Sequence, residues 1–595
     1  MPFNDTVPKY YISPPKGKRH DRGDRNSITC GACVHSGPPV TTILSQDLAM
    51  DMQRRGCPQT VPANNNNVLV IGGAGSGKTF AYTGPNLMQA DSSYVVTDYS
   101  GGLYRQYGPF LEYMGYKVRC LNLIEMGHGG HYNPFNYIRS DEDIESLVNT
   151  LIAVTIPPEE QKDDPFWEKA EKALLMAVTA YIHYYTAPSQ QTFSNIMRLL
   201  RAGETDEDDP SMRSALDTIF EQIEELEPES FAVRQYKTFK MATERALKRI
   251  IISCLMRLMT FDLKDVADMT GTDDIGLDTI GDEKTALFII IPTGEKTFNF
   301  IAAMLYSQLF RRMRDYCDNT ARFSQLITYG NGEVLRCYRA DSREESLEKR
   351  EEAGKFLAKA KEAEVCFNTC TGRFEICTMD GEMIAHRGSK KEAQKVLDLV
   401  RTTGTVTGTA QGAGGWSVMP VPVRLMLDEF ENIGMQVPDF VNMVYSMNTY
   451  GISTSLFSSS LVLMFKHYKK GWDDIVNAFD TVLFFSSLYL CGEANYDFVA
   501  KWVIKEKRER IRDNIRKKKK DSNMALDNYT GKDLCMGKDI IRDILALKED
   551  ECVVIMKHAG VHKGKRYQAV QHPQHGLVKS LGTQAARRGS VKENI

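Results

Sequence analysis

A glycine-rich run behind an apolar segment constrains the fold more than any other feature of this sequence. Val68–Ile71 is followed at once by Gly-Gly-Ala-Gly-Ser-Gly-Lys-Thr, which fits the phosphate-binding loop pattern G-x-x-x-x-G-K-[ST] between a strand and a helix. Glycines let backbone N–H groups curve around a polyphosphate without Cβ clashes. A glycine-rich turn that binds nothing is the alternative. The sequence predicts that a nucleotide contacts Gly72, Gly73, Ala74, Gly75, Ser76, Gly77, Lys78 and Thr79.

A second segment supplies the acids that such a site needs. The apolar strand expected at Val423–Leu427 ends in Asp428-Glu429. In P-loop NTPases an acid at this position holds Mg²⁺, and a carboxylate can activate the attacking water. We therefore expect Asp428 to bind Mg²⁺ and Glu429 to be the catalytic general base. Lys78 would act as a second catalytic residue on the β- and γ-phosphates, and the Thr79 hydroxyl would contact Mg²⁺. Because the sequence has no Asn-Lys-x-Asp guanine-binding motif, the expected cofactors are ATP and Mg²⁺.

Length and charge are those of a large water-soluble protein. A chain of 595 residues is too long to form a single hydrophobic core, and at about 150 residues per domain this length suggests three or four domains. A formal net charge of −3 gives no global attraction to nucleic acid, so DNA binding would need a local patch. No run of about 18 apolar residues occurs, and the polar start is not a signal peptide. These features predict a cytoplasmic protein with no intrinsic membrane span.

The order of apolar runs indicates the fold class. Runs at 68–71, 94–97 and 117–123 alternate with helical patterns, and further runs follow after residue 285. Such alternation predicts a parallel sheet buried on both faces. The predicted class is α/β: a P-loop NTPase with a mostly parallel twisted sheet, an inserted all-α domain and a small α+β insert. The expected divisions are a disordered arm (1–40), three NTPase parts (41–139, 281–321 and 421–575), the all-α domain (140–280), the α+β insert with a return linker (322–420) and a flexible tail (576–595).

Two further patterns each allow two interpretations. The basic run 505–520 suits contact with a DNA phosphate backbone, but its interleaved acids also fit a solvated helix. Cys30-x-x-Cys33 suits part of a zinc site, but no second pair follows at the usual spacing, so free thiols are the alternative. The candidate DNA-binding residues are Lys505, Lys507, Arg508, Arg510, Lys517, Lys518, Lys519 and Lys520.

Several ordered segments carry a family resemblance. Besides the two nucleotide motifs, they are Pro85-Asn86-Leu87-Met88-Gln89, Tyr132-Asn133-Pro134-Phe135, Asp164-Pro165-Phe166-Trp167, Tyr236-Lys237-Thr238-Phe239-Lys240 and Gly281-Asp282-Glu283-Lys284. Together they resemble the coupling ATPases of conjugative type IV secretion systems, the DNA-pumping branch of RecA-like motors. The likeness is to members from Gram-positive elements, and it spans 41–575 apart from the 322–420 insert.

The resemblance implies an activity and a set of partners. It implies a RecA-like ATPase, acting as a homo-hexamer, that recruits and translocates relaxase-bound single-stranded DNA. Other implied partners are the ATPase or membrane components of the secretion channel, which would hold the protein at the inner face of the cell membrane.

Four departures from the family pattern modify this expectation. The family normally carries N-terminal transmembrane helices, which this sequence lacks. Asp98-Tyr99-Ser100-Gly101-Gly102 lacks the lysine and the glutamate of the family's usual Asp-Pro-Lys-Gly-Glu. Ser458-Ser459-Ser460 replaces a glutamine-serine pair, and the turn 448–451 has no arginine. An arginine that stabilises transition-state charge raises NTPase rates by about 10³–10⁵. The alternative prediction is therefore a soluble adaptor that binds ATP, hydrolyses it poorly and docks relaxosome components.

Overall fold

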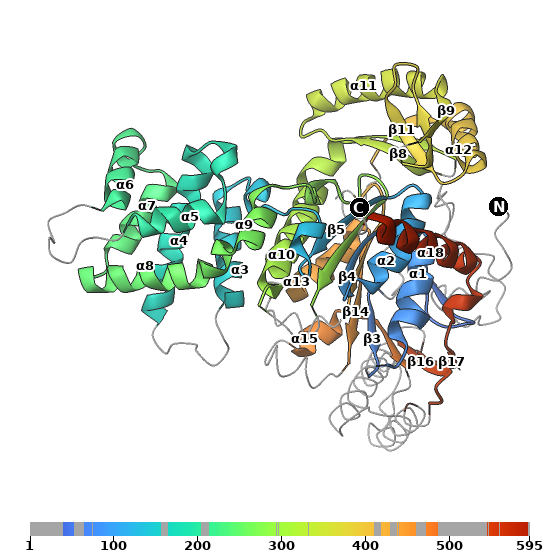
Figure 1. Ribbon diagram of the computed structural model, residues 1–595, viewed down its shortest axis with the longest axis horizontal. Coiled ribbons are helices and arrows are strands. Elements are labelled where there is room, and N and C mark those ends of the chain that lie inside the picture. The colour runs from blue at the N-terminus through green and yellow to red at the C-terminus, as the bar shows by residue number, and fades with distance from the viewer. Residues whose placement is uncertain are drawn as a thin grey trace, which may run out of the picture.

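Apolar strands buried on both faces form the centre of this protein, for which we analysed a computed structural model. The structure describes residues 40–52, 65–73, 75–155, 165–203, 214–292, 294, 297–330, 332–369, 371–409, 418–428, 437, 440–459, 472–485, 544, 547–557 and 560–592. A helical domain extends from one side of the central α/β body, and a small α+β insert lies beside another part of it (Figure 1).

The central sheet joins segments that are far apart in the sequence. In the described part of the chain it has nine strands, in the order β17-β16-β15-β3-β14-β13-β4-β6-β5. The strands from β15 to β5 in this order run parallel, and β16 and β17 are added antiparallel. The bounds are β3 (Val68–Ile71), β4 (Ser93–Tyr99), β5 (Lys117–Asn122), β6 (Thr285–Ile291), β13 (Val423–Leu427), β14 (Ile452–Ser458), β15 (Thr481–Phe485), β16 (Glu551–Met556) and β17 (Gly560–Lys565).

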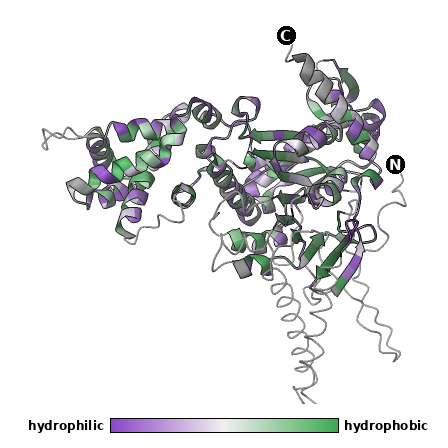
Figure 2. Cartoon of the chain, turned by 60° about the horizontal axis from the view of Figure 1, so that its bottom comes forward, coloured by the Kyte–Doolittle hydropathy of each residue, from purple (hydrophilic) through white to green (hydrophobic). Residues whose placement is uncertain are grey.

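Helices cover both faces of this sheet. Every residue of β3 and β6 is buried, as expected for parallel strands inside an α/β layer structure, and Figure 2 shows the central strands as largely hydrophobic. Along β3, Leu69 and Ile71 join one apolar core, whereas Val68 and Val70 join the other. The first core includes α10 (Asn299–Asp315), α13 (Phe440–Met447) and α15 (Trp472–Asn477). The second includes α1 (Gly84–Met88), α2 (Gly102–Tyr113) and α18 (His575–Lys592).

The described residues of the stretch predicted to be an all-α insert form helices joined by turns and short loops. Side-chain caps fix several helix starts: Thr192 accepts a hydrogen bond from Asn195 N, and Ser214 forms a capping box with Asp217. The helices are α3 (Asp141–Thr155), α4 (Pro165–Tyr185), α5 (Phe193–Arg201), α6 (Ala215–Leu226), α7 (Phe231–Lys240), α8 (Glu244–Leu258) and α9 (Lys264–Gly271).

The second insert contains two three-stranded sheets, β12-β7-β8 and β11-β10-β9, packed with two helices around their own core. A two-point ion pair joins Arg339 to Asp282, with Nε and Nη2 at 2.8 and 3.1 Å from the carboxylate oxygens. Gly388 N also donates to Tyr113 O of α2 (3.1 Å). The elements are β7 (Gln325–Tyr329), β8 (Glu333–Tyr338), α11 (Arg343–Lys361), β9 (Glu364–Asn368), β10 (Arg373–Cys377), β11 (Met383–Arg387), α12 (Lys390–Thr403) and β12 (Thr405–Gly408).

The predicted fold class is confirmed, whereas two local predictions are wrong. The tail predicted to be flexible at 576–595 contains α18, because Val578 is buried and Leu577 and Leu581 pack onto the core beside α2. The return linker expected within 322–420 begins with β12, which pairs with β7. The other domain boundaries remain predictions. The arm 1–39 lies outside the described residues, as do Cys30 and Cys33. No helix among the described residues is long and apolar enough to cross a membrane.

A candidate nucleotide site

The carboxyl ends of the parallel strands converge at one edge of the sheet. In open α/β sheets this is the edge where ligands bind. The loop that starts at Gly72 follows β3, and Asp428 follows β13. Strand β14 lies between these two and ends at Ser458, whose carbonyl accepts a hydrogen bond from Gly72 N (3.2 Å). The topology therefore brings both nucleotide motifs to the same edge.

The glycines of the loop adopt conformations that other residues rarely reach. Gly75 and Gly77 have φ angles of +72° and +79°, in the left-handed region. A Cβ atom at Gly72 would lie 2.5 Å from Ser76 Oγ, so the loop closes tightly on itself. These constraints explain the glycine spacing in physical terms. Ala74 lies outside the described residues.

Lys78 is folded into the loop. It is only 7% exposed, and its Nζ donates to Gly72 O (2.6 Å) and Gly73 O (3.2 Å). Ser76 Oγ is also buried and has no hydrogen-bond partner among the described residues. A buried donor without a partner is unfavourable, since such groups are almost always satisfied. A hydroxyl and an ammonium group inside a loop with left-handed glycines fit a polyphosphate ligand.

The chain becomes helical as soon as it leaves the loop. Thr79 is exposed and begins a π-helical segment, Thr79–Thr83, which continues directly into α1. Ala81 N donates to Gly77 O (2.8 Å), and Tyr82 Oη lies 2.9 Å from Ser455 Oγ on β14. The amino end of this helical stretch, with its partial positive charge, therefore begins at the loop.

Asp428 is placed by the strand before it. All of β13 is buried, and Asp428 is half-buried just beyond its end. With β14 in between, β13 and β3 are two strand spacings apart, about 10 Å. A Mg²⁺ ion with its water ligands can span such a gap. Glu429 lies outside the described residues, so its assignment as general base stays a prediction.

A buried polar network connects β13 with the loop helix. Arg424 of β13 is 3% exposed, and its Nη2 donates to Thr41 O (2.6 Å) and to Asp91 Oδ2 (2.9 Å). Asn86 of α1 lies beside it and donates through Nδ2 to Tyr82 O (2.8 Å). Because Arg424 and Asp91 are paired in this network, the strand that precedes Asp428 is held in register with the helical stretch that starts at Thr79.

The segment that departs from the family pattern at 98–102 has a structural role. Asp98 is 1% exposed, and its Oδ2 accepts a hydrogen bond from Tyr104 N (2.7 Å) in the first turn of α2. Burial raises the pKa of this carboxyl, while backbone hydrogen bonds oppose the shift. Ser100 and Gly101 form a left-handed turn with φ angles of +68° and +71°. Asp98 therefore caps a helix at the same sheet edge.

Arg566 is a site residue that sequence reasoning missed. It follows β17, and its Nη1 donates to Ser76 O (2.5 Å) in the phosphate-binding loop. Its Nε donates to Glu551 O (3.1 Å), and its Cζ lies 5.3 Å from the centre of the Phe485 ring. Nothing local marks this arginine, since 490 residues separate it from Ser76. Desolvation lowers its pKa. The candidate DNA-binding run 505–520 lies outside the described residues.

Two family models match this chain over the segments that carry the candidate site. A family model described as type IV secretory system conjugative DNA transfer matches residues 46–324, and a second, described as the TraM recognition site of TraD and TraG, matches 422–542. The two spans contain the phosphate-binding loop and Asp428, respectively. Curated protein sequences give no match.

Solved structures that are similar to this chain include two of the bacterial conjugative coupling protein TrwB. Unbound TrwBdeltaN70 is 10% identical over 88% of this chain and 87% of its own, with a TM-score of 0.47. TrwB in complex with ADP and Mg²⁺ is 9% identical over 86% and 89%, with a TM-score of 0.46. VirB4 of Thermoanaerobacter pseudethanolicus is 10% identical over 90% and 97%, with a TM-score of 0.41. These values mark a distant likeness.

Proposed function

Because this chain belongs to the conjugative DNA-transfer coupling proteins of type IV secretion systems, we propose that it is an ATPase that recruits and translocates relaxase-bound single-stranded DNA. The observation that carries the ATPase part is the buried Lys78 amine, which two loop carbonyls hold beside the unpartnered Ser76 hydroxyl. The DNA part rests on the family.

ATP and Mg²⁺ are the proposed cofactors, and TrwB has been solved with ADP and Mg²⁺ and with a non-hydrolysable ATP analogue. In this chain the Lys78 ammonium would exchange its two loop carbonyls for phosphate oxygens. Thr79 and Asp428 would hold Mg²⁺, which neutralises negative charge on the phosphates. Glu429 would accept the proton of the attacking water.

The partners we propose follow from the family rather than from the site. They are single-stranded DNA, its relaxase, and the ATPase or membrane components of a secretion channel, with the protein acting as a homo-hexamer at the inner face of the membrane. The basic run 505–520 is the proposed contact with the DNA phosphates.

A second candidate function is a soluble adaptor that binds ATP and hydrolyses it poorly. The turn 448–450 favours it, because its side chains serve structural contacts where the family has an arginine. Asn448 Oδ1 accepts a hydrogen bond from Asn66 N (2.9 Å), and Tyr450 Oη donates to Asp318 Oδ1 (2.6 Å). In this chain the turn therefore contributes no charge to a neighbouring active site.

ATP turnover with and without single-stranded DNA separates the two functions. We expect DNA to stimulate turnover, and Glu429→Gln to keep ATP binding but abolish turnover, because an amide cannot accept the water's proton. Replacing Lys517, Lys518, Lys519 and Lys520 by glutamine should remove the stimulation and leave basal turnover intact. The matched control for Glu429→Gln is Glu344→Gln, on α11 of the insert, which should hydrolyse ATP as the parent does.

Each negative result has a distinct meaning. Parental turnover by Glu429→Gln would show that the general base is wrong. If DNA changes neither turnover nor ATP affinity while ATP still binds, the adaptor function replaces the translocase.

A further inference from the structure

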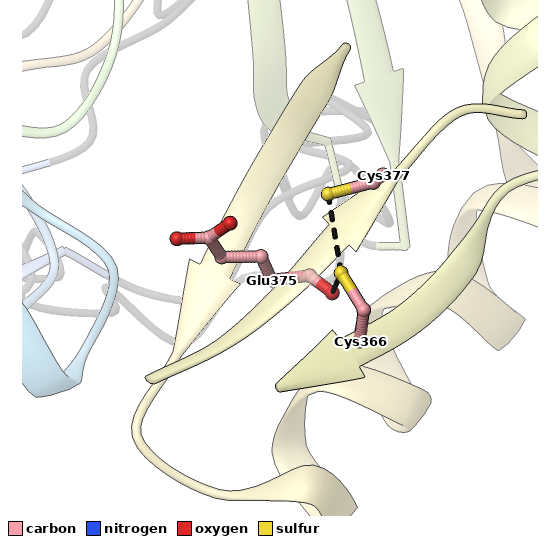
Figure 3. A group of neighbouring side chains, drawn as sticks. All are labelled: Cys366, Glu375 and Cys377. Carbon is pink, nitrogen blue, oxygen red and sulfur yellow. Dashed lines mark hydrogen bonds between the residues drawn. The ribbon is translucent and has the colours of Figure 1, made fainter. Parts of the chain in front are cut away.

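Two cysteines and a glutamate converge on the insert, away from the nucleotide site. Cys366 lies on β9, and Glu375 and Cys377 lie on β10 (Figure 3). The antiparallel register places Cys366 directly opposite Glu375, with Cys377 two residues further along the same face. One potential ligand atom from each of the three side chains lies within 4.8 Å of the others.

The opposite face of these strands fixes the position of the cluster. Val365, Phe374 and Ile376 point to that face and pack into the apolar core of the insert with α11 and α12. Because side chains alternate along a strand, Cys366, Glu375 and Cys377 are directed away from this core. Cys366 is exposed, and the other two are half-buried. An ion can therefore reach the cluster, whose backbone is held by packing on its other side.

The spacing of the two sulfur atoms suits a bridging ion better than a disulfide. The Sγ atoms are 3.3 Å apart, but the two cysteines are diagonal rather than directly opposite. Diagonal pairs have Cα atoms about 7–8 Å apart, beyond the roughly 4.4–6.8 Å of most disulfides. Two thiolates on a tetrahedral zinc ion, with bonds of about 2.3 Å, lie about 3.8 Å apart. The present pair needs to open by only about 0.5 Å to reach that distance.

The carboxylate of Glu375 is already oriented by its neighbours. Its Oε1 accepts hydrogen bonds from Asn368 Nδ2 (2.7 Å) and Thr371 Oγ1 (3.5 Å). Carboxylates that ligate metals are commonly held in this way by a second set of hydrogen bonds. The Sγ atom of Cys366 also lies 3.5 Å from the Glu375 carbonyl oxygen, which keeps the thiol on the same side of the strand pair.

We propose that Cys366, Cys377 and Glu375 form a binding site for one thiophilic divalent cation of the zinc class, with water as the fourth ligand. Thiolate ligands select zinc-like ions over Mg²⁺ and Ca²⁺. On binding, each S–H bond breaks, an S–metal bond forms and the proton passes to solvent, so no electron is transferred. The site clamps β9 to β10, and it is independent of the proposed ATPase function.

Zinc titration of the reduced full-length chain tests the site. Other cysteines can also bind zinc, so the readout is a difference: Cys366→Ser/Cys377→Ser should bind one equivalent less than the parent. Cys337→Ala, on β8 of the same insert, is the matched control and should bind as the parent does. Glu375→Gln should weaken binding at this site at least about tenfold, and Asn368→Ala about 10–100-fold through loss of ligand orientation. Cd²⁺ should give a thiolate charge-transfer absorption that the double variant reduces.

Two results would overturn the proposal. One is equal zinc stoichiometry in the parent and the double variant. The other is a reduced parent that binds no zinc here but readily forms a Cys366–Cys377 disulfide, which would make the pair a redox couple. Glu375→Gln leaves both cysteines in place, so it guards against an effect of misfolding in the double variant.

Discussion

Replacing Lys78 with alanine tests the nucleotide site most directly. The Lys78 ammonium is buried, and its hydrogen bonds go to Gly72 O and Gly73 O. A charge-assisted hydrogen bond contributes about 1.5–3 kcal/mol, which corresponds to about 10–150-fold in affinity. Because the amine must leave two carbonyl partners before it binds phosphate, we expect the lower end of this range. Lys78→Ala should therefore weaken ATP–Mg²⁺ binding about 10–30-fold.

Isothermal titration calorimetry with ATP–Mg²⁺ measures this change. Lys117→Ala is the matched control, since it removes the same charge at the amino end of β5, the edge of the sheet opposite the loop. The control should bind ATP as tightly as the parent, and urea unfolding should show that both variants fold. Unchanged ATP affinity in a folded Lys78→Ala protein would refute the assignment of the loop as a phosphate site.

Two further predictions concern stability. Arg424→Met should lower the free energy of unfolding by about 3–5 kcal/mol, because it leaves the buried Asp91 carboxylate without its cation. Urea unfolding measures this loss, and the additional substitution Asp91→Asn should restore part of the lost stability. Burial and the nearby His575 lower the pKa of His572 from 6.5 to about 4. Between pH 4 and pH 6.5 the unfolded chain therefore binds more protons at His572 than the folded protein does. The contribution of His572 to the free energy of unfolding is fully present above pH 6.5, and it falls by up to about 3 kcal/mol as the pH drops towards 4. Urea unfolding at pH 7 and pH 4.5 should show a smaller acid-induced loss for His572→Gln than for the parent; an equal loss would contradict the role of His572.

Those features of the fold that depend on local pattern can be predicted from the sequence. The strands β3, β4, β6 and β13 each contain a short run of mostly apolar residues, because a strand buried on both faces tolerates few polar side chains. The glycine-rich loop after β3 follows a local pattern as well, since left-handed φ angles such as those at Gly75 and Gly77 strongly favour glycine. Residues after β3 and β13 could be assigned to one site because parallel strands end at a common edge.

Contacts between segments that are far apart in the sequence could not be predicted and become visible in the folded protein. The order of strands places β14 between the two nucleotide motifs, and it brings Arg566 to Ser76 across 490 residues of sequence. The helix α18, whose sequence resembles a polar tail, packs onto the core beside α2. Pairing of β9 with β10 places Cys366, Glu375 and Cys377 on one face of the two strands. A local sequence pattern predicts the secondary structure of a segment and which of its faces is buried. It does not predict which other segment that strand or helix will pack against, because this choice depends on the packing of the whole chain.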